Sequence, residues 1–297
     1  MADSLILTAS NSKQFLTCRR AWYCRQELCL VPKYTKPSLS IGKAFHKGEE
    51  TGSIDEAMKS LDIFYPSNQE DADSLEIAKA TVQAMLEGYW KRFPKYEDSR
   101  AEVQFEIPIL SPKGRHTKHV LRGKIDRTVP LQSRNWLQEL KTATKVDRTY
   151  IERLDLDHQF TTYFYAAYRL GLNPAGGIYR MVRKPSIRPK KNETIPQFCE
   201  RLIGDYQERP EFYFFEERLY RTQRDLKEFE AELWGIVKDI QAARKENRWY
   251  RSTGRCGDWG RCDYLPLCRG VEGSEEFYKF AVPNQELEEV EEVGDAA

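Results

Sequence analysis

Residues 120–145 read VLRGKIDRTVPLQSRNWLQELKTATK, and this stretch decides the fold. Its two apolar segments alternate in the manner of neighbouring strands, yet each carries charge where a buried strand is normally apolar. Asp126 lies in the first segment, and Glu139 and Lys141 lie in the second, separated by Leu140. Burying a carboxylate is costly unless a partner compensates it, so the two strands predict a site that receives a positive charge.

The composition bounds the class of protein. The chain has 297 residues, of which 40% are hydrophobic and 31% are charged, and its formal net charge is +1. These values are typical of a globular chain that can bury a full core. No apolar run is long enough to span a bilayer and residues 1–13 do not resemble a signal peptide, so we expect a cytoplasmic protein with no membrane contact.

Charge is unevenly distributed along the chain. Residues 113–124 and 179–191 are strongly basic, whereas residues 284–297 are acidic and predict a disordered tail. The basic segments predict either a patch that binds nucleic acid or ordinary solvated loops, and charge alone does not separate these two interpretations.

Hydrophobic periodicity predicts a single α/β domain over residues 1–283, with its core at about 40–220. Helices are expected over residues 13–26, from Gly42, from Asp73 to Pro94, from Asp157 to Gly171 and from Thr222. Strands are expected over residues 101–109, 119–129, 135–142, 176–184 and 211–220. The first three strands are expected to be antiparallel neighbours.

The charged strands indicate a specific chemistry. Asp126 and Glu139 on adjacent strands can converge on one hard cation, and Mg²⁺ and Mn²⁺ prefer carboxylate oxygens. Residues i and i+2 of a strand share a face, so Lys141 projects beside Glu139, where it can orient water or stabilise charge on a phosphate. The alternative is a Glu139–Lys141 salt bridge on an exposed face. The apolar neighbours Ile125 and Leu137 favour the metal site, and the arrangement indicates phosphodiester cleavage.

These residues resemble a known family. GKID, which ends at Asp126, followed by ELK from Glu139 is similar to the PD-(D/E)XK nuclease superfamily, in its RecB-like branch. GKAFHKGEE at residues 42–50 has the branch's G-x-x-x-H-x-x-x-E form, and QFTTY at residues 159–163 matches its Q-x-x-x-Y motif, all in the family's order. The resemblance implies a restriction-endonuclease-like core, with a central mixed sheet flanked by helices.

The resemblance also implies an activity and its residues. The chain is expected to be a Mg²⁺- or Mn²⁺-dependent deoxyribonuclease, an exonuclease acting on DNA ends in recombination, repair or phage DNA processing. The implied metal ligands are His46, Asp126, Glu139 and the Leu140 carbonyl. The implied catalytic residues are Asp126, Glu139, Lys141, Gln159 and Tyr163, with Lys141 positioning the water that attacks phosphorus in line.

The expected partner is DNA that is single-stranded or has free ends. Candidate DNA contacts are Arg122, Lys124, Gln159, Tyr163, Arg183 and Lys184, the four cations being phosphate contacts drawn from the basic segments. No Walker A loop is present, so any helicase or recombination motor is a separate partner, and an oligomer is compatible with the sequence.

The cysteines suggest a second metal group. Seven cysteines in a chain expected to be cytoplasmic argue against disulfides. Cys256, Cys262 and Cys268 are each separated by five residues, and three thiolates need a fourth ligand for zinc or an iron–sulfur cluster. By resemblance to AddB-type and CRISPR adaptation nucleases, Cys18 is the fourth ligand of a [4Fe-4S] cluster that joins residues 10–30 to 250–270. Zinc is the alternative group, and Cys24 can replace Cys18.

Two other interpretations remain open at this point. One is a catalytically silent nuclease fold that binds DNA or assists recombination. The other is a zinc-stapled module for protein interaction, in which the charges on the strands form only salt bridges. Retention of all the motifs argues against the first, and metal content separates the second.

Overall fold

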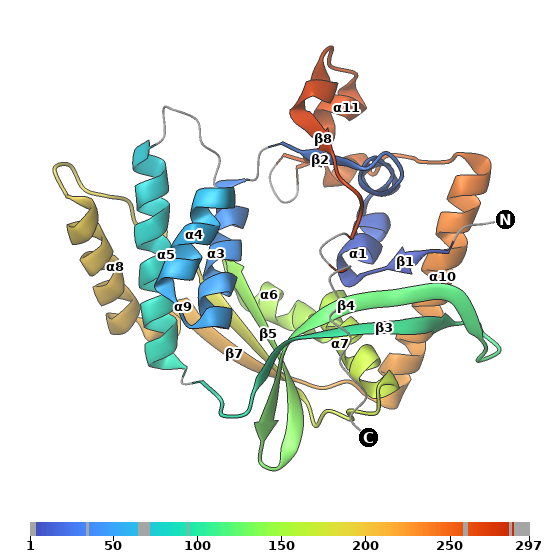
Figure 1. Cartoon of the computed structure of the whole chain (residues 1–297), viewed down its shortest axis with the longest axis horizontal. Helices are drawn as coiled ribbons and strands as arrows, with labels where there is room; N and C mark the ends of the chain where they lie inside the picture. The colour runs from blue at the N-terminus through green and yellow to red at the C-terminus, as the bar shows by residue number, and fades with distance from the viewer. Residues whose placement is uncertain are drawn as a thin grey trace.

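The computed structural model describes residues 4–33, 36–64, 72–93, 95–257, 261–284 and 287. In these residues a six-stranded mixed sheet carries helices on both faces, and a separate two-stranded sheet joins segments near the chain ends (Figure 1). The expected α/β architecture, a central mixed sheet flanked by helices, is therefore confirmed. Most of the predicted acidic tail lies outside the described residues. Among those described, no helix is both long and apolar enough to cross a membrane.

The large sheet is built around one long strand. Its strands are β1 (Ile6–Leu7), β3 (Arg100–Leu110), β4 (His116–Leu131), β5 (Arg134–Ala143), β6 (Gly177–Arg183) and β7 (Phe214–Leu219). Their order is β1-β4-β5-β6-β7, and β3 pairs with β4 along its other edge. The pairs β3–β4 and β4–β5 are antiparallel, as the alternation predicts, whereas β5 and β6 are parallel.

The hairpin between β4 and β5 sets the register of the charged residues. Gln132 and Ser133 form its two-residue turn, and both have positive φ angles, 52° and 59°. Such a turn matches the twist of the flanking strands, although glycine or asparagine is the usual occupant. Arg127 consequently pairs with Gln138, so the next residues along the two strands, Asp126 and Glu139, face each other.

One face of the sheet is covered by helices from the first third of the chain and one later hairpin of helices. They are α3 (Pro37–Thr51), α4 (Ile54–Phe64), α5 (Ala72–Arg92), α8 (Ile195–Glu208) and α9 (Pro210–Tyr213). Their core with the sheet includes Phe45, Met85, Leu86, Leu140, Val182 and Phe198. Figure 1 shows this group as a layer to the left of the sheet.

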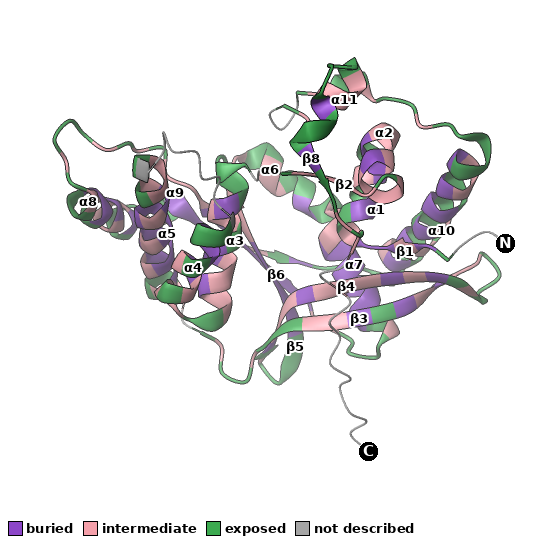
Figure 2. Ribbon diagram, turned by 45° about the horizontal axis from the view of Figure 1, so that its top comes forward, coloured by how far each residue is buried: buried purple, intermediate pink, exposed green. Residues whose placement is uncertain are grey.

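The opposite face carries α1 (Ala9–Thr17), α7 (His158–Arg169) and α10 (Gln223–Glu246). Asp157 caps α7 by accepting the Phe160 N–H at 2.8 Å, and Thr222 and Asp225 form the predicted capping box of α10. The apolar positions predicted for α10 are buried against the sheet; they are Leu226, Phe229, Leu233, Ile236, Val237 and Ile240 (Figure 2).

Some predicted boundaries were wrong. The helix expected from Gly42 begins at Pro37, because proline is well suited to the first helical turn. The strand expected from residue 211 begins at Phe214, since Pro210 opens the short helix α9. Sequence analysis also missed the helices α4 and α8, whose apolar positions lie in segments rich in charge and turn residues.

Two segments, residues 19–32 near one end of the chain and the described part of residues 253–280 near the other, pack together beside the core. The N-terminal part contains α2 (Arg19–Trp22), the π-helix η1 (Tyr23–Glu27) and β2 (Leu30–Pro32). The C-terminal part contains η3 (Thr253–Arg255), α11 (Leu265–Arg269), η4 (Ser274–Phe277) and β8 (Tyr278–Phe280), while α6 (Arg148–Glu152) and η2 (Arg153–Leu156) lie between β5 and α7. Strands β2 and β8 pair antiparallel, and Tyr264 donates its hydroxyl to the Leu30 carbonyl at 2.8 Å. Non-covalent contacts therefore join these two segments.

Two glycines give opposite predictions for the same substitution. A Cβ on Gly177 would overlap the buried Phe160 ring, so Gly177→Ala is expected to lower the free energy of unfolding by about 3 kcal/mol. Gly204 lies within α8 with no neighbour in reach of an added Cβ, so Gly204→Ala is expected to stabilise by about 1 kcal/mol. Urea unfolding of both variants measures these changes, and the same sign for both would contradict the packing of α7 on β6.

Candidate active site

The candidate site lies where β4 changes partners. On one edge β4 pairs with β1 at Val120 and Leu121, and with β5 from Arg127 onward. Between these two regions that edge of β4 has no paired strand in the described sheet. Asp126 takes up the role of a strand partner there, because its Oδ2 accepts the Leu140 N–H at 3.3 Å. The sheet therefore opens into a fork at Asp126.

The Glu139 carboxylate of the site is completely buried. Its side chain is 0% exposed, and among the described residues its carboxylate has no hydrogen-bond partner other than Lys141. The Lys141 ammonium contacts Oε1 as an ion pair. Burial raises the pKa of Glu139 well above its usual value, and the neighbouring Asp126 carboxylate raises it further, while Lys141 opposes both effects.

The Lys141 side chain points toward the Glu139 carboxylate and carries a positive charge. Burial acts to lower its pKa, but the Glu139 and Asp126 carboxylates outweigh burial and raise it. The ammonium therefore stays protonated beside two carboxyl groups. The predicted projection of Lys141 and Glu139 from one face of β5 agrees with this contact.

His46 reaches the site from α3. Burial lowers its pKa to about 4, and Asp126 offsets part of the effect. The imidazole is therefore neutral, the form that can ligate a metal. Gly42, one turn earlier in α3, explains the close approach of this helix: a Cβ there would lie 3.1 Å from Thr142 Oγ1 of β5.

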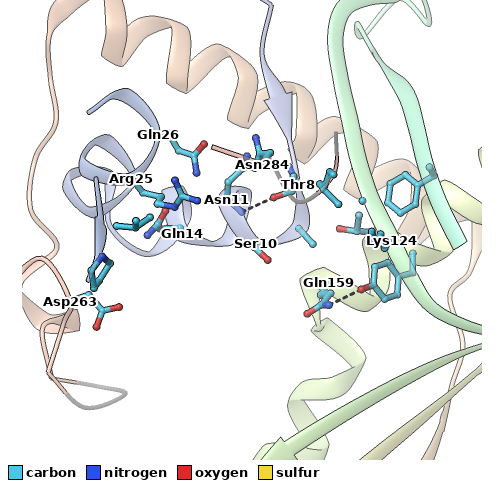
Figure 3. Close-up of a pocket in the computed structure, with 18 of the residues that line it drawn as sticks. Thr8, Ser10, Asn11, Gln14, Arg25, Gln26, Lys124, Gln159, Asp263 and Asn284 are labelled. Atoms are coloured by element: carbon cyan, nitrogen blue, oxygen red, sulfur yellow. Dashed lines mark hydrogen bonds between the residues drawn. The ribbon is translucent and has the colours of Figure 1, made fainter. Parts of the chain in front are cut away.

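The helix α7 supplies the third wall of the site. Gln159 Nε2 donates to the Tyr163 hydroxyl at 2.7 Å (Figure 3), and that hydroxyl donates to Asp126 Oδ1 at 3.3 Å. Burial raises the pKa of Tyr163 well above its usual value, and Glu139 and Asp126 add to this effect. The fold thus brings the predicted set together; its members are His46, Asp126, Glu139, Lys141, Gln159 and Tyr163.

The donor groups fit a hard cation, although they do not form a ligand cluster. Within the part of the chain that the structure describes, no three His, Cys, Asp or Glu side chains are placed so that they could hold a metal ion. Asp126 is engaged instead by Leu140 and Tyr163. A neutral histidine and two facing carboxylates, one of them the fully buried Glu139, are nevertheless suited to Mg²⁺ or Mn²⁺, whose charge would compensate the burial.

Two predicted DNA contacts are paired with carboxylates on the sheet. Arg122 Nη2 lies 2.5 Å from Glu106 Oε2, and Lys124 Nζ lies 3.0 Å from Glu102 Oε2. Both pairs join β3 to β4 across their antiparallel register. The two cations are accessible at the surface, but each already has a counter-charge.

The other two predicted cations make interior contacts. Arg183 donates to the Val146 carbonyl at 2.6 Å, and its guanidinium lies 4.2 Å from the centre of the Phe212 ring. Lys184 donates to the Ser38 carbonyl at 2.5 Å, and burial lowers its pKa. These contacts tie β6 to the neighbouring helices, a structural role that charge counting does not anticipate.

Sequence analysis missed an ion pair behind the site. Arg127, next to Asp126, points to the opposite face of β4 and lies 2.9 Å from Glu49 Oε2. Glu49 is one helical turn after His46, and the two side chains of the pair are only 11% and 14% exposed. The pair therefore clamps the helix that carries His46 to the strand that carries Asp126. The available signal was position, since Arg127 directly follows Asp126 and Glu49 comes one helical turn after His46.

A second buried cation lies on the same face. Arg180 of β6 is 4% exposed, and it donates to Glu216 at 2.8 Å and to the hydroxyls of Tyr89 and Tyr96 at 3.2 and 3.0 Å. It pairs in register with Leu140, between Glu139 and Lys141. A polar network thus backs β5 at the site.

The predicted cysteine ligands lie near one another without forming a cluster. Burial raises the pKa of Cys262 and of Cys268, and the Cys18 and Cys256 thiols are close enough to add to this effect. Cys24, which was not chosen, is buried in the same region, where burial raises its pKa to about 11. All seven cysteines are free thiols, and the described residues contain no metal-holding group. The thiols lie close together, but the described residues show no metal-holding group, so the [4Fe-4S] cluster is not confirmed and stays a prediction.

Comparisons with known proteins give one strong result. A family model of the PD-(D/E)XK nuclease superfamily matches residues 6–269. No curated protein matches the chain. Among solved structures, the crystal structure of SSO0001 is similar over 80% of this chain and 76% of that chain, with 11% sequence identity and a TM-score of 0.32. A likeness at that score carries no argument about this chain.

The ion pair behind the site gives a stability prediction. Glu49→Gln leaves Arg127 buried without a counter-charge, and a loss of about 3 kcal/mol in unfolding free energy is expected. The matched control is Glu228→Gln in the exposed Arg224–Glu228 pair, which is expected to change the same quantity by less than about 1 kcal/mol. Equal effects in urea unfolding would contradict the proposed clamp.

Proposed function

The chain belongs to the PD-(D/E)XK nuclease superfamily, and we propose that it is a metal-dependent DNA nuclease that hydrolyses phosphodiester bonds at DNA ends. The observation that carries the proposal is the buried Glu139 carboxylate, which faces Asp126 and has the Lys141 ammonium as its ion-pair partner. If no cation bound there, an apolar residue at position 139 would be expected to make the fold more stable than a buried glutamate does.

We propose that His46, Asp126, Glu139 and the Leu140 carbonyl hold one or two Mg²⁺ or Mn²⁺ ions. A bound ion supplies a water nucleophile of lowered pKa and polarises the phosphate oxygen. Lys141, kept protonated by the two carboxylates, orients that water and stabilises negative charge on the phosphate. Its position two residues after Glu139 keeps the ammonium on the same face as the ligands.

The remaining residues are proposed to hold the DNA strand. Gln159 and Tyr163 form a hydrogen-bonded pair that ends on Asp126, so a strand bound to them lies beside the reacting phosphate. Arg122 and Lys124 can exchange their surface carboxylates for DNA phosphates at little cost, because exposed ion pairs contribute little. Lys184 remains a candidate, whereas the contacts of Arg183 favour a structural role.

The biological setting rests on the resemblance of the motifs. We propose an exonuclease in recombination, repair or phage DNA processing, working with a separate helicase or recombination protein. Seven free thiols suit the reducing conditions of the cytoplasm.

We also propose that Cys18, Cys256, Cys262 and Cys268 bind a [4Fe-4S] cluster, with Zn²⁺ as the alternative. Support comes from the mutual proximity of their thiols, which the pKa shifts of Cys262 and Cys268 reflect, and from the meeting of both chain ends at this place. A bound cluster would link segments more than two hundred residues apart, and such a link strongly restricts the unfolded chain.

The nuclease proposal is tested on Lys141. Lys141→Met keeps the apolar stem and removes the charge, so cleavage of end-labelled DNA with Mn²⁺ or Mg²⁺ is expected to fall by about 1,000-fold or more. The matched control, Lys145→Met, removes an exposed ammonium that pairs with Asp147 and is expected to cleave like the unaltered chain.

Thermal unfolding of both variants establishes that each is folded. Chelation by EDTA is expected to stop cleavage, and dialysis into Mn²⁺ to restore it. No cleavage of single- or double-stranded DNA by the anaerobic, metal-loaded protein would refute the enzymatic proposal.

The cluster proposal is tested on Cys262. Anaerobically purified protein is expected to contain iron and acid-labile sulfide, and Cys262→Ser is expected to lose the visible absorbance and to unfold at a lower temperature. Cys29→Ser, in the same N-terminal region but outside the proposed ligand set, is the control and should keep both. Zinc without iron would replace the cluster by the alternative, and unaltered absorbance and melting in Cys262→Ser would refute the staple.

A further inference from the structure

A polar groove leads away from the candidate active site. Its volume is about 430 Å³, and it lies between the N-terminal segment on one side and β4 with α7 on the other (Figure 3). Gln159 and Lys124 line the second wall, next to Tyr163. The groove therefore begins where the proposed metal site ends.

The N-terminal wall is lined by amide groups. Gln14 of α1 and Gln26 of η1 both line the groove, and in the described part of the chain neither side-chain amide forms a hydrogen bond. Asn11 is different, since its side chain completes the capping box of α1. The free amides can donate to and accept from the polar edges of a ligand.

Positive charge lines both walls. Arg25 lies on the N-terminal wall and donates to the Ala281 carbonyl at 3.2 Å, and no carboxylate among the described residues forms an ion pair with it. Lys124, whose Nζ lies 3.0 Å from Glu102 Oε2, is on the opposite wall. The acidic group of the groove, Asp263, is paired with Lys36 at 2.7 Å. The groove thus suits a ligand that combines negative charge with hydrogen-bonding groups.

We propose that this groove binds a single nucleic-acid strand as it approaches the metal site. Arg25 contacts a backbone phosphate, and Gln14 and Gln26 contact base edges or sugar oxygens. The N-terminal segment is then a substrate-binding wall in addition to a part of the proposed staple. The inference rests on the proposed nuclease function, and it names the form of the substrate and a binding surface on a different part of the chain.

The size of the groove separates a single strand from a duplex. A volume of about 430 Å³ is in the lower part of the range for sites that enclose small ligands, so it holds a nucleotide or two and not a double helix. Duplex DNA would have to lose pairing at its end before a strand could enter. An acidic peptide shares the negative charge but lacks the base edges that the amides suit.

The test uses substitutions that change charge with little change in shape. Gln14→Glu and Gln26→Glu place carboxylates in the groove, and each is expected to weaken binding of a short oligothymidylate by about 10-fold, as repulsion between like charges predicts. Gln223→Glu makes the same change at an exposed position at the start of α10 and is the matched control. Binding of the oligothymidylate and of a blunt duplex is measured by fluorescence anisotropy, with Ca²⁺ in place of Mg²⁺ or Mn²⁺.

Arg25 gives a second, independent readout. The plot of log affinity against log salt concentration has a negative slope, and loss of one phosphate contact to a single strand reduces the magnitude of that slope by about 0.7. Arg25→Ala is expected to show this decrease in magnitude, and Arg25→Lys is expected to retain the original slope. Circular dichroism and thermal unfolding establish that each variant is folded. A slope unaffected by Arg25→Ala would remove Arg25 from the strand path.

The outcomes distinguish this inference from the nuclease proposal. With thymidine 5′-p-nitrophenyl phosphate as a small diester, the loss caused by the groove variants on the oligonucleotide is expected to exceed any loss on the ester by about 10-fold. Unaltered oligonucleotide binding by both Gln→Glu variants, equal weakening of the duplex, or displacement of the strand by a polyglutamate peptide at equal concentration would overturn the inference. A chain that binds the strand but cleaves neither substrate would refute the nuclease proposal and leave the groove in place.

Discussion

The cost of burying the Glu139 carboxylate is the constraint on which the rest of the site depends. Lys141 contributes one positive charge, but burial and the facing Asp126 raise the pKa of Glu139 well above its usual value, so both carboxyl groups ionise together only if further positive charge is supplied. If this ion pair served only stability, a pair at the surface or two apolar residues in its place would avoid the free-energy cost of desolvating the charges. Under the proposed function a bound cation would compensate this burial, and the low pKa of His46, about 4, keeps its imidazole neutral beside it.

The break between strands β4 and β5 leaves the Asp126 carboxylate uncovered by a neighbouring strand. A continuous ladder between β4 and β5 would have covered Asp126, but β4 leaves β5 before this residue and joins β1 instead. The Asp126 side chain accepts the Leu140 N–H that the ladder would otherwise use, so opening the sheet leaves no lost hydrogen bond at this point. On the other face, the Arg127–Glu49 pair holds α3 in place, which gives the open fork a rigid support.

The sequence predicted the parts of the fold whose signals are local. Alternation in β3, β4 and β5 and the caps at Asp157 and Thr222 depend only on neighbouring residues, and these elements were found. The side chains that the motifs selected around Asp126 also meet in space, because helix and strand periods place them on shared faces. The fork, the Arg127–Glu49 pair and the interior contacts of Arg183 depend on which distant segments meet, and no local period encodes that. The helix α8 was missed although its signal is local, since Thr194 and Gln197 form a capping box at its start.

The proposed staple and the proposed strand groove depend on the same short segment. Cys18 ends α1 in an extended conformation and separates it from α2, and Arg25 directly follows the buried Cys24 in η1. The same segment is held to the C-terminal part by the β2–β8 pairing. Any group that fixes Cys18 to the C-terminal cysteines therefore also fixes the wall that carries Gln14 and Arg25. Loss of that group should loosen the grip on the strand before it disturbs the carboxylates in the sheet, because the large sheet has its own core and its own ion-pair support.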